Sequence, residues 1–243
     1  MKARRGPSPS FLIALICLAV VAAYGYRHFF ARSSYASAYR TAYLQSPAQK
    51  LDTSEEIAKL SPEQRHFLSR LADAAIERTR HDVVYDPKYV VIPYPGGDVP
   101  EGTGVCTDVV IRSYRALGVD LQRLVHEDMK KRFGQYPKIW GMKAPDSNID
   151  HRRVPNLIKY FEKHGKKLPI SQRGSDYRTG ALVAWRLAGG ATHIGIVTGK
   201  MSTDGKRPLV VHNIGAGPQL EDVLFEYEII GHFLFVPRSL EKQ

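Results

Sequence analysis

Cysteine is scarce in this chain, which holds only two, Cys17 and Cys106, among 243 residues. So few cysteines exclude a small domain held together by disulfides and a zinc site built on cysteine clusters. The sequence also lacks HExxH, HxH and paired-cysteine spacings. A zinc site on His193, His212 and His232 therefore has no motif to support it, and we expect no cofactor or metal.

Acidic residues are absent from the first 38 positions, which carry five basic ones. An apolar run extends from Phe11 to Tyr24, and small residues follow at positions 36–38. This order is typical of an export leader, which we predict at residues 1–38. The run is shorter than the roughly 20 residues that span a membrane, so the leader is either a cleaved signal peptide or a membrane anchor. In both cases we expect an exported protein, periplasmic or held at the inner membrane facing the periplasm.

The net charge of the chain is +11, and the five basic residues of the leader leave +6 for the rest. A modest positive excess suits peptidoglycan, another anionic envelope polymer or a membrane surface, although scattered solvated lysines explain it equally well. No stripe of basic residues interleaved with aromatic ones occurs, so we expect no nucleic-acid partner.

Three helices are predicted within a single domain at residues 56–243, which follows a polar linker at residues 39–55. Ser61 and Pro62 begin the first helix, because serine caps a helix and proline suits its first turn. The second helix covers Val105 to Leu117 and is stopped by Gly118, and the third covers Arg152 to His164.

Strands dominate the last third of the domain, where β-rich runs alternate with glycine-rich turns. A further short strand is predicted at "YVVIPY", residues 89–94. Helices first and strands later favour an α+β fold in which the helices pack on an antiparallel sheet. The predicted strands of the last third lie within "GALVAWRL", "THIGIVTG", "PLVVHNIG" and "VLFEYEIIGHFLFVP".

Cys106 is the only thiol outside the leader, and it stands where a glycine- and proline-rich loop meets the helix at Val105 to Leu117. The N-terminus of a helix favours thiolate over thiol, so we predict a depressed pKa for Cys106. Helical spacing puts Cys106 on a stripe with Val110 and Ser113, which turns the sulfur toward the packed side. The alternative interpretation is a small buried hydrophobic residue.

A nucleophilic thiol needs a base, normally a histidine oriented by a third group. His193 lies on a predicted strand face with Gly195, whose missing side chain would let a helix pack beside the imidazole. His212 and Asn213 are the polar pair of the next strand, and the pleat sends them to opposite faces. Only one of the two can therefore orient His193.

The ordered set of these features resembles the NlpC-type, papain-like cell-wall cysteine peptidases, and more closely an uncharacterised exported bacterial family related to them. The resemblance implies an NlpC-type fold with Cys106 as nucleophile, His193 as base and His212 as the third residue. It also implies that Tyr94 lies near the oxyanion site and that peptidoglycan stem peptides are the substrate. The features that carry the resemblance are Pro93, Tyr94, Gly96 and Gly97 ahead of Cys106, then "GALV", "HIGI" and the position of His212.

Two departures from the peptidase pattern concern the substrate more than the chemistry. The peptidases usually have the sequence Asp-Cys-Ser-Gly around the nucleophile, whereas Cys106 is flanked by Val105, Thr107 and Asp108. The stretch "GALV" also lacks the aspartate that usually follows its glycine. Asp108 is a candidate for the substrate-binding set, or else a partner of the helix dipole.

Arg152 belongs to a second polar stretch, "DSNIDHRR", and is a candidate clamp for a substrate carboxylate. The alternative for this stretch is structural: Asp150 would cap the following helix, and the arginines would be solvated or paired.

Three functions are compatible with these residues. The first is an envelope cysteine hydrolase that cleaves an amide bond. The second uses the same pair on an ester or in acyl transfer on a lipid, and the third is a non-catalytic cell-wall binding module.

Overall fold

The computed structural model describes residues 58–237. All of them belong to the second of the two units into which the chain divides, Lys50–Gln243. The predicted leader at residues 1–38 and the predicted linker at residues 39–55 lie outside the described residues. Among the described helices, none is long and apolar enough to cross a membrane.

Two of the predicted helices begin and end close to the expected residues. α3 covers Pro62–Arg78, and Ser61 caps it in a capping box in which Gln64 reaches back to the Ser61 amide. α4 covers Cys106–Arg115. The chain leaves α4 through Gly118, whose φ of 77° is a conformation that glycine adopts without strain.

The other two helices, α5 and α6, differ from the prediction. α5, Leu121–Arg132, was not predicted, although Asp120 caps it and Leu121, Val125 and Met129 form a buried stripe. α6 covers Val154–His164 and is preceded by a 3-10 turn at Asp150–Arg152. Asp150 is therefore not the cap that the sequence suggested, because the helix begins after Arg153.

The strands form one antiparallel sheet in the order β3-β8-β4-β5-β6-β7. This sheet and the helices confirm the α+β class. Three of the predicted β-rich runs contain β4, β6 and β8, and the fourth matches β5 except for its last two residues. The strands of the sheet are β3 (Lys166–Lys167), β4 (Leu182–Arg186), β5 (Thr192–Met201), β6 (Pro208–His212), β7 (Gln219–Glu221) and β8 (Glu228–Leu234).

The strand predicted at residues 89–94 is wrong. A β-prone sequence forms a strand only beside another strand. Here the hydrogen bonds of the segment go to side chains instead. Tyr89 donates its hydroxyl to Asp146, 3.0 Å away, and the amide of Ile92 donates to Asn148 at 2.9 Å. A short parallel pair lies beside this segment: β1, Val84–Tyr85, pairs with β2, Thr103–Gly104, just ahead of α4.

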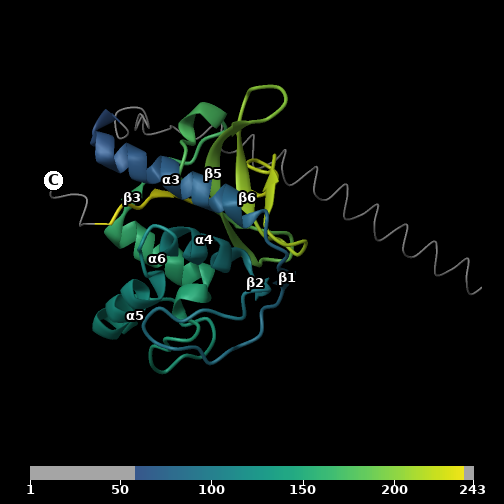
Figure 1. Ribbon diagram of the computed structural model, residues 1–243. Helices are drawn as coiled ribbons and strands as arrows, with labels where there is room; N and C mark the ends of the chain where they lie inside the picture. The colour runs from purple at the N-terminus through teal and green to yellow at the C-terminus, as the bar shows by residue number, and fades with distance from the viewer. Residues whose placement is uncertain (1–57, 238–243) are drawn as a thin grey trace, which may run out of the picture. The chain divides into compact units, whose positions relative to one another are not determined.

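The core lies between the sheet and the helices α3, α4 and α6, which pack against it (Figure 1). Tyr114 of α4 stacks near Phe161 of α6 and donates its hydroxyl to the Phe235 carbonyl at 2.9 Å. This packing holds the first turn of α4 next to β5, where the site described below is formed.

Candidate active site

Cys106 is the first residue of α4 and is 4% exposed. The backbone N–H of Ile194 on β5 can donate to its sulfur, as can the N–H groups of Thr107 and of Cys106 itself, and these donors lower the pKa. Burial outweighs them and raises the pKa of Cys106 to about 12. The direction is opposite to the depressed pKa that the helix start predicted. The thiol is therefore protonated in the folded structure at neutral pH.

His193, at the start of β5, contacts His212, the last residue of β6. His193 Nε2 lies 2.9 Å from His212 Nδ1, and the two rings meet edge to face. Both side chains are buried. This contact was predicted from the order of residues in the resembling peptidases. The neighbour of His193 is therefore His212 and not Asn213. Asn213 instead accepts from the amide of Gly215 at 3.1 Å and so holds the turn after β6.

The imidazole of His193 stacks on Trp185, its cross-strand neighbour on β4, with ring centroids 5.6 Å apart. Burial, and then the neighbouring His212, lower the pKa of His193 to about 3. His193 is thus a neutral imidazole at pH 7, and it lies one residue before the amide that faces the Cys106 sulfur. The buried thiol and the histidine next to its amide donor are thus both neutral.

Glu221 of β7 was missed at the sequence level. Its Oε2 lies 2.9 Å from His212 Nε2, the ring nitrogen that faces away from His193. The ring N–H is not well aligned with that oxygen, so the contact is electrostatic more than a directed hydrogen bond. No local signal pointed to Glu221, because β7 is only three residues long and its turn residues favoured a loop.

Gly195 makes room for the histidine pair, but not in the way predicted. A Cβ at this position would lie 2.9 Å from the Val211 carbonyl and 3.2 Å from the Cβ of His212. The close neighbour is therefore strand β6, not a helix. A side chain at position 195 would push the strand that carries His212 away from His193.

Tyr94, which was predicted near the oxyanion site, contacts α5, and a second tyrosine, Tyr85, lies near enough to Cys106 to interact with it electrostatically. The Tyr94 ring packs edge-on against His126 of α5, and burial and the neighbouring Glu127 raise its pKa. Tyr85 on β1 pairs with Gly104, two residues before Cys106. Burial, and then the neighbouring Cys106 and Asp108, raise the pKa of Tyr85, so its hydroxyl stays protonated.

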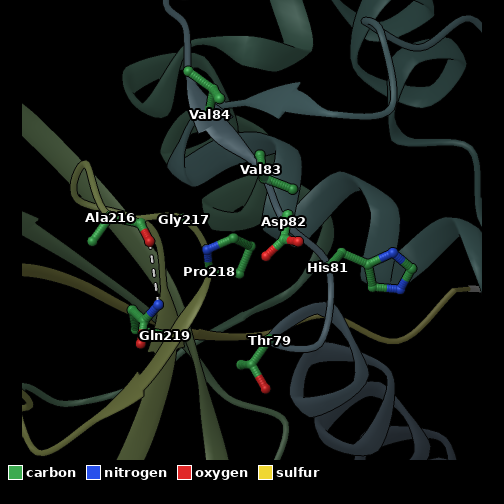
Figure 2. Close-up of a pocket in the computed structure, with 9 residues that line it drawn as sticks. All are labelled: Thr79, His81, Asp82, Val83, Val84, Ala216, Gly217, Pro218 and Gln219. Atoms are coloured by element: carbon green, nitrogen blue, oxygen red, sulfur yellow. Dashed lines mark hydrogen bonds between the residues drawn. The ribbon is translucent and has the colours of Figure 1, made fainter.

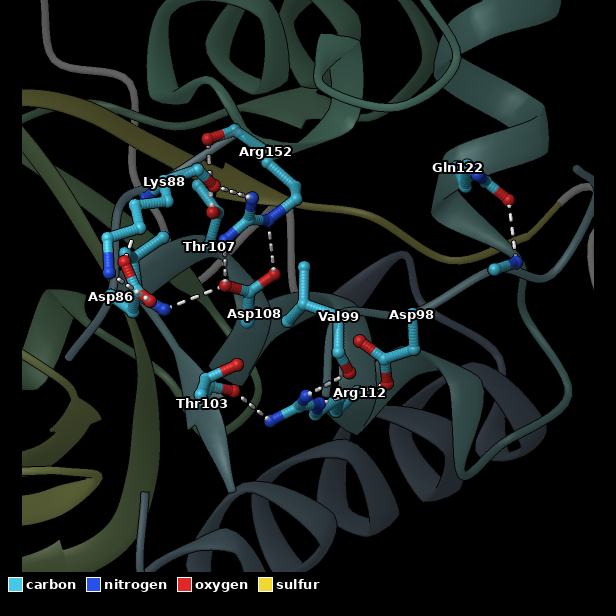
Figure 3. Close-up of polar contacts among 12 residues, drawn as sticks. Asp86, Lys88, Asp98, Val99, Thr103, Thr107, Asp108, Arg112, Gln122 and Arg152 are labelled. Carbon is cyan, nitrogen blue, oxygen red and sulfur yellow. Dashed lines mark hydrogen bonds and ion pairs between the residues drawn. The ribbon is translucent and has the colours of Figure 1, made fainter. Parts of the chain in front are cut away.

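Asp108 and Arg152 neutralise each other beneath the first turn of α4 (Figure 3). The Arg152 guanidinium donates to both carboxylate oxygens at 2.9 Å, and both side chains are buried. Asp108 also accepts from the amide of Val105 at 2.7 Å, which fixes the start of the helix. This pairing agrees with the structural interpretation of Arg152 as a paired arginine, and it keeps Asp108 in the first turn of the helix as a partner of the helix dipole. Arg152 also donates through Nη1 to the Lys88 carbonyl at 3.3 Å, and its side chain is 2% exposed.

Arg112 holds the loop that leads to Cys106 (Figure 3). This buried guanidinium pairs with Asp98 and donates to the carbonyls of Val99, Pro100, Glu101 and Thr103. Gln122 of α5 fixes the other end of the loop, because its side chain bonds the Gly97 amide and the Pro93 carbonyl at 2.9 Å each. The loop and the helix start thus form one rigid unit.

A metal site is not formed by the histidines. His232 donates its Nδ1–H to the Pro169 carbonyl and stacks on Tyr177, while His193 and His212 contact each other. Within residues 58–237, no group of three histidine, cysteine or acidic side chains is placed to hold a metal ion.

Comparison with known proteins places the chain in a family. The family described as "Domain of unknown function (DUF1287)" matches residues 72–235, a range that contains all of the residues of this site. The chain belongs to the DUF1287 family. It is also 54% identical over 165 residues to "Uncharacterized protein YijF" of Escherichia coli (strain K12), an alignment that covers 68% of this chain and 80% of that protein. Neither description states an activity for this DUF1287 protein.

Proposed function

We propose that this DUF1287 protein is a cysteine hydrolase of the cell envelope that cleaves an amide bond in peptidoglycan stem peptides. The observation that carries the proposal is the contact between His193 and His212 on the sheet, with Glu221 behind them and with the amide of Ile194, the residue after His193, facing the buried thiol. Cys106 begins α4 beside β5, His193 Nε2 lies 2.9 Å from His212 Nδ1, and Glu221 lies behind His212. The α+β arrangement supports an NlpC-type fold, and the leader predicted at residues 1–38 supports an envelope location.

The protonation states favour a mechanism in which the proton moves during attack. At rest the thiol and the imidazole of His193 are both neutral, because burial raises the pKa of Cys106 and lowers that of His193. As the sulfur attacks the amide carbonyl carbon, His193 Nδ1 takes the thiol proton. The imidazolium then gives that proton to the departing amine, and a thioester remains on Cys106. Water attacks the thioester and releases the acid and the free thiol.

His212 and Glu221 keep His193 in the tautomer that this step needs. The free Nδ1 of His193 acts as base only if the proton is on Nε2, where it is donated to His212 Nδ1. The proton of His212 then lies on Nε2 and faces the Glu221 carboxylate. Tyr85 is our candidate for an oxyanion donor together with the backbone N–H groups at the start of α4.

Acyl transfer is the second candidate, and burial of the site is the observation that favours it. Cys106 is 4% exposed and His193 is 2% exposed. A site closed to bulk water protects a thioester from hydrolysis and gives another nucleophile time to attack. Hydrolysis and acyl transfer would use the same residues and would differ only in the molecule that accepts the acyl group from Cys106.

The test is incubation of the purified full-length chain with isolated peptidoglycan, followed by mass analysis of the released fragments. We expect fragments with new free carboxyl ends from the wild type and none from Cys106→Ser or His193→Ala. Cys17→Ala is the matched cysteine control and should keep full activity. Thermal melting of each variant shows whether it is folded. Full activity in Cys106→Ser would end the proposal, and ligated rather than hydrolysed products would select acyl transfer.

A further inference from the structure

Large apolar side chains are exposed on two loops, at four positions outside the candidate active site. The loop after β1 exposes Tyr89 and Val91, and the loop after α5 exposes Ile139 and Trp140. Ile139 is 65% exposed and Trp140 is 45% exposed. Single exposed apolar residues are ordinary in a soluble domain, whereas a group of them marks a binding surface.

Polar contacts hold the two loops together. Tyr89 donates its hydroxyl proton to Asp146 at 3.0 Å and accepts from the side-chain amide of Asn148 at 2.8 Å. The guanidinium of Arg153 lies over the Trp140 ring, 4.3 Å from the ring centroid. Its charge also acts on the Tyr89 hydroxyl and on the Asp146 carboxylate. Both aromatic rings therefore lie near one guanidinium, and the two loops form one surface.

The loop that carries Trp140 is basic. Residues 129–145 contain five basic residues and no acidic one. Arg132 pairs with Asp128, but the four lysines form no ion pair with an acidic residue among residues 58–237. Lys138 donates to the Phe133 carbonyl at 2.7 Å, so the loop lies against the end of α5. The four lysines, all exposed, are Lys130, Lys131, Lys138 and Lys143.

An anionic phospholipid bilayer matches this combination of side chains. Tryptophan and tyrosine favour the interface between lipid headgroups and acyl chains, and lysines beside them are attracted to the headgroup phosphates. The Trp140 surface is defined as Tyr89, Val91, Ile139 and Trp140 with Lys138 and Lys143. We propose that this surface docks on an anionic phospholipid bilayer, with Ile139 and Trp140 at the level of the headgroups. The proposal does not depend on the proposed hydrolase activity.

A glycan strand is another polymer that exposed aromatic rings can bind, and the neighbouring polar groups do not favour it. Recognition of a sugar needs polar side chains that are free to bond its hydroxyl groups. Asp146 and Asn148 already bond each other and Tyr89. One face of the Trp140 ring is covered by Arg153. The positive charge and the exposed Ile139 are better matched by lipid.

A different exposed apolar residue, Val84, lacks this basic surround. It lines a pocket of about 280 Å³ between residues 79–84 and residues 216–219 (Figure 2). No lysine or arginine is among the residues that line this pocket. Exposed apolar groups and unpaired lysines therefore coincide at the Trp140 surface and not at the pocket of Val84.

Trp140 itself reports on docking. The chain has two tryptophans, Trp140 and Trp185, and Trp185 is fully buried. The full-length chain is mixed with vesicles of phosphatidylcholine, or of phosphatidylcholine with phosphatidylglycerol, whose acyl chains carry bromine. Bromine quenches tryptophan emission only at short range, so the measured quenching shows contact of Trp140 with lipid. Trp140→Phe leaves Trp185 as the background.

Two double variants test the contribution of charge. Lys138→Gln with Lys143→Gln removes two positive charges from the Trp140 surface. Lys200→Gln with Lys206→Gln removes the same charge at exposed positions near the turn between β5 and β6, and is the matched control. A membrane anchor in the leader predicted at residues 1–38 would hold every variant on both kinds of vesicle. Anchoring alone therefore produces no difference among them.

We expect quenching in the wild type and in the Lys200 and Lys206 double variant, only on vesicles with phosphatidylglycerol, and none in Trp140→Phe. A lysine near an anionic surface contributes about fivefold to binding, so the Lys138 and Lys143 double variant should dock about 30-fold more weakly.

Three results would each overturn the proposal: no quenching in the wild type, equal quenching on the two kinds of vesicle, or equal losses in the two double variants. Soluble peptidoglycan fragments are the remaining probe. If they change the emission of Trp140 while brominated lipid does not quench it, the surface binds a glycan and the membrane proposal is wrong.

Discussion

Alkylation of Cys106 as a function of pH tests the resting state of the site most directly. Burial raises the pKa of this thiol to about 12, whereas an exposed cysteine titrates at about 8.5. Only the thiolate reacts with iodoacetamide. The difference of about 3.5 pH units makes the thiolate of Cys106 about 3,000-fold rarer than that of an exposed cysteine at neutral pH.

The expected result is a rate that keeps rising with pH. The logarithm of the rate should increase by about one for each pH unit from neutral pH to well above pH 9, without a plateau. This slope is independent of how easily the reagent reaches the sulfur, because limited access lowers the rate equally at every pH. Peptide mass analysis separates the alkylation of Cys106 from that of Cys17.

The same measurement in concentrated urea provides the reference, where the rate should level off at about pH 8.5. A plateau at or below that pH in the folded protein would refute the reasoning. It would mean that the backbone donors at the start of α4 outweigh burial at the Cys106 sulfur.

Three further results are expected. Tyr85→Phe should slow the release of peptidoglycan fragments about 100-fold, as removal of an oxyanion donor does, whereas Tyr94→Phe should not; the opposite ranking would restore Tyr94. Glu221→Gln should lower kcat/KM about tenfold and alter its pH profile without a change in melting temperature. Glu228→Gln, at an exposed position, should change neither kcat/KM nor its pH profile, and equal effects of the two substitutions would remove Glu221 from the site. Acid should destabilise the fold below about pH 6.5, because folded-state pKa values below the unfolded value mean stability that is lost as pH falls. Between neutral pH and about pH 5 the loss is about 2 kcal/mol for each of three buried histidines, or about 6 kcal/mol in urea unfolding, and a flat profile would contradict it. These histidines are His151, His193 and His232, with pKa values lowered to about 3, about 3 and about 4.

Features that depend on neighbouring residues in the chain were predictable. The cap of α3 at Ser61, the end of α4 before Gly118 and the start of α4 at Cys106 follow from local hydrogen bonding and backbone conformation. The choice of His212 over Asn213 was also made in advance. Strand alternation left one of the two on the face of His193, and the order of residues in the resembling peptidases decided between them.

Local patterns also misled in two places. Residues 89–94 have a β-prone sequence but no strand beside them, and side chains from the segment around Asp146 and Asn148 take their hydrogen bonds. α5 was overlooked, although its buried stripe has helical spacing, because charged residues fill the rest of the helix.

The remaining features of the site were decided by contacts between distant parts of the chain. Arg152 lies 44 positions from Asp108 and neutralises it, and β1 places Tyr85 near the thiol. Glu221 reaches His212 only through the pairing of β7 with β6. The sequence by itself determined that Cys106 lies in the first turn of a helix and that only one of His212 and Asn213 can face His193. Tertiary structure decided the protonation of Cys106, because the cost of burying a charge depends on everything packed around it, while the helix start depends only on the chain nearby.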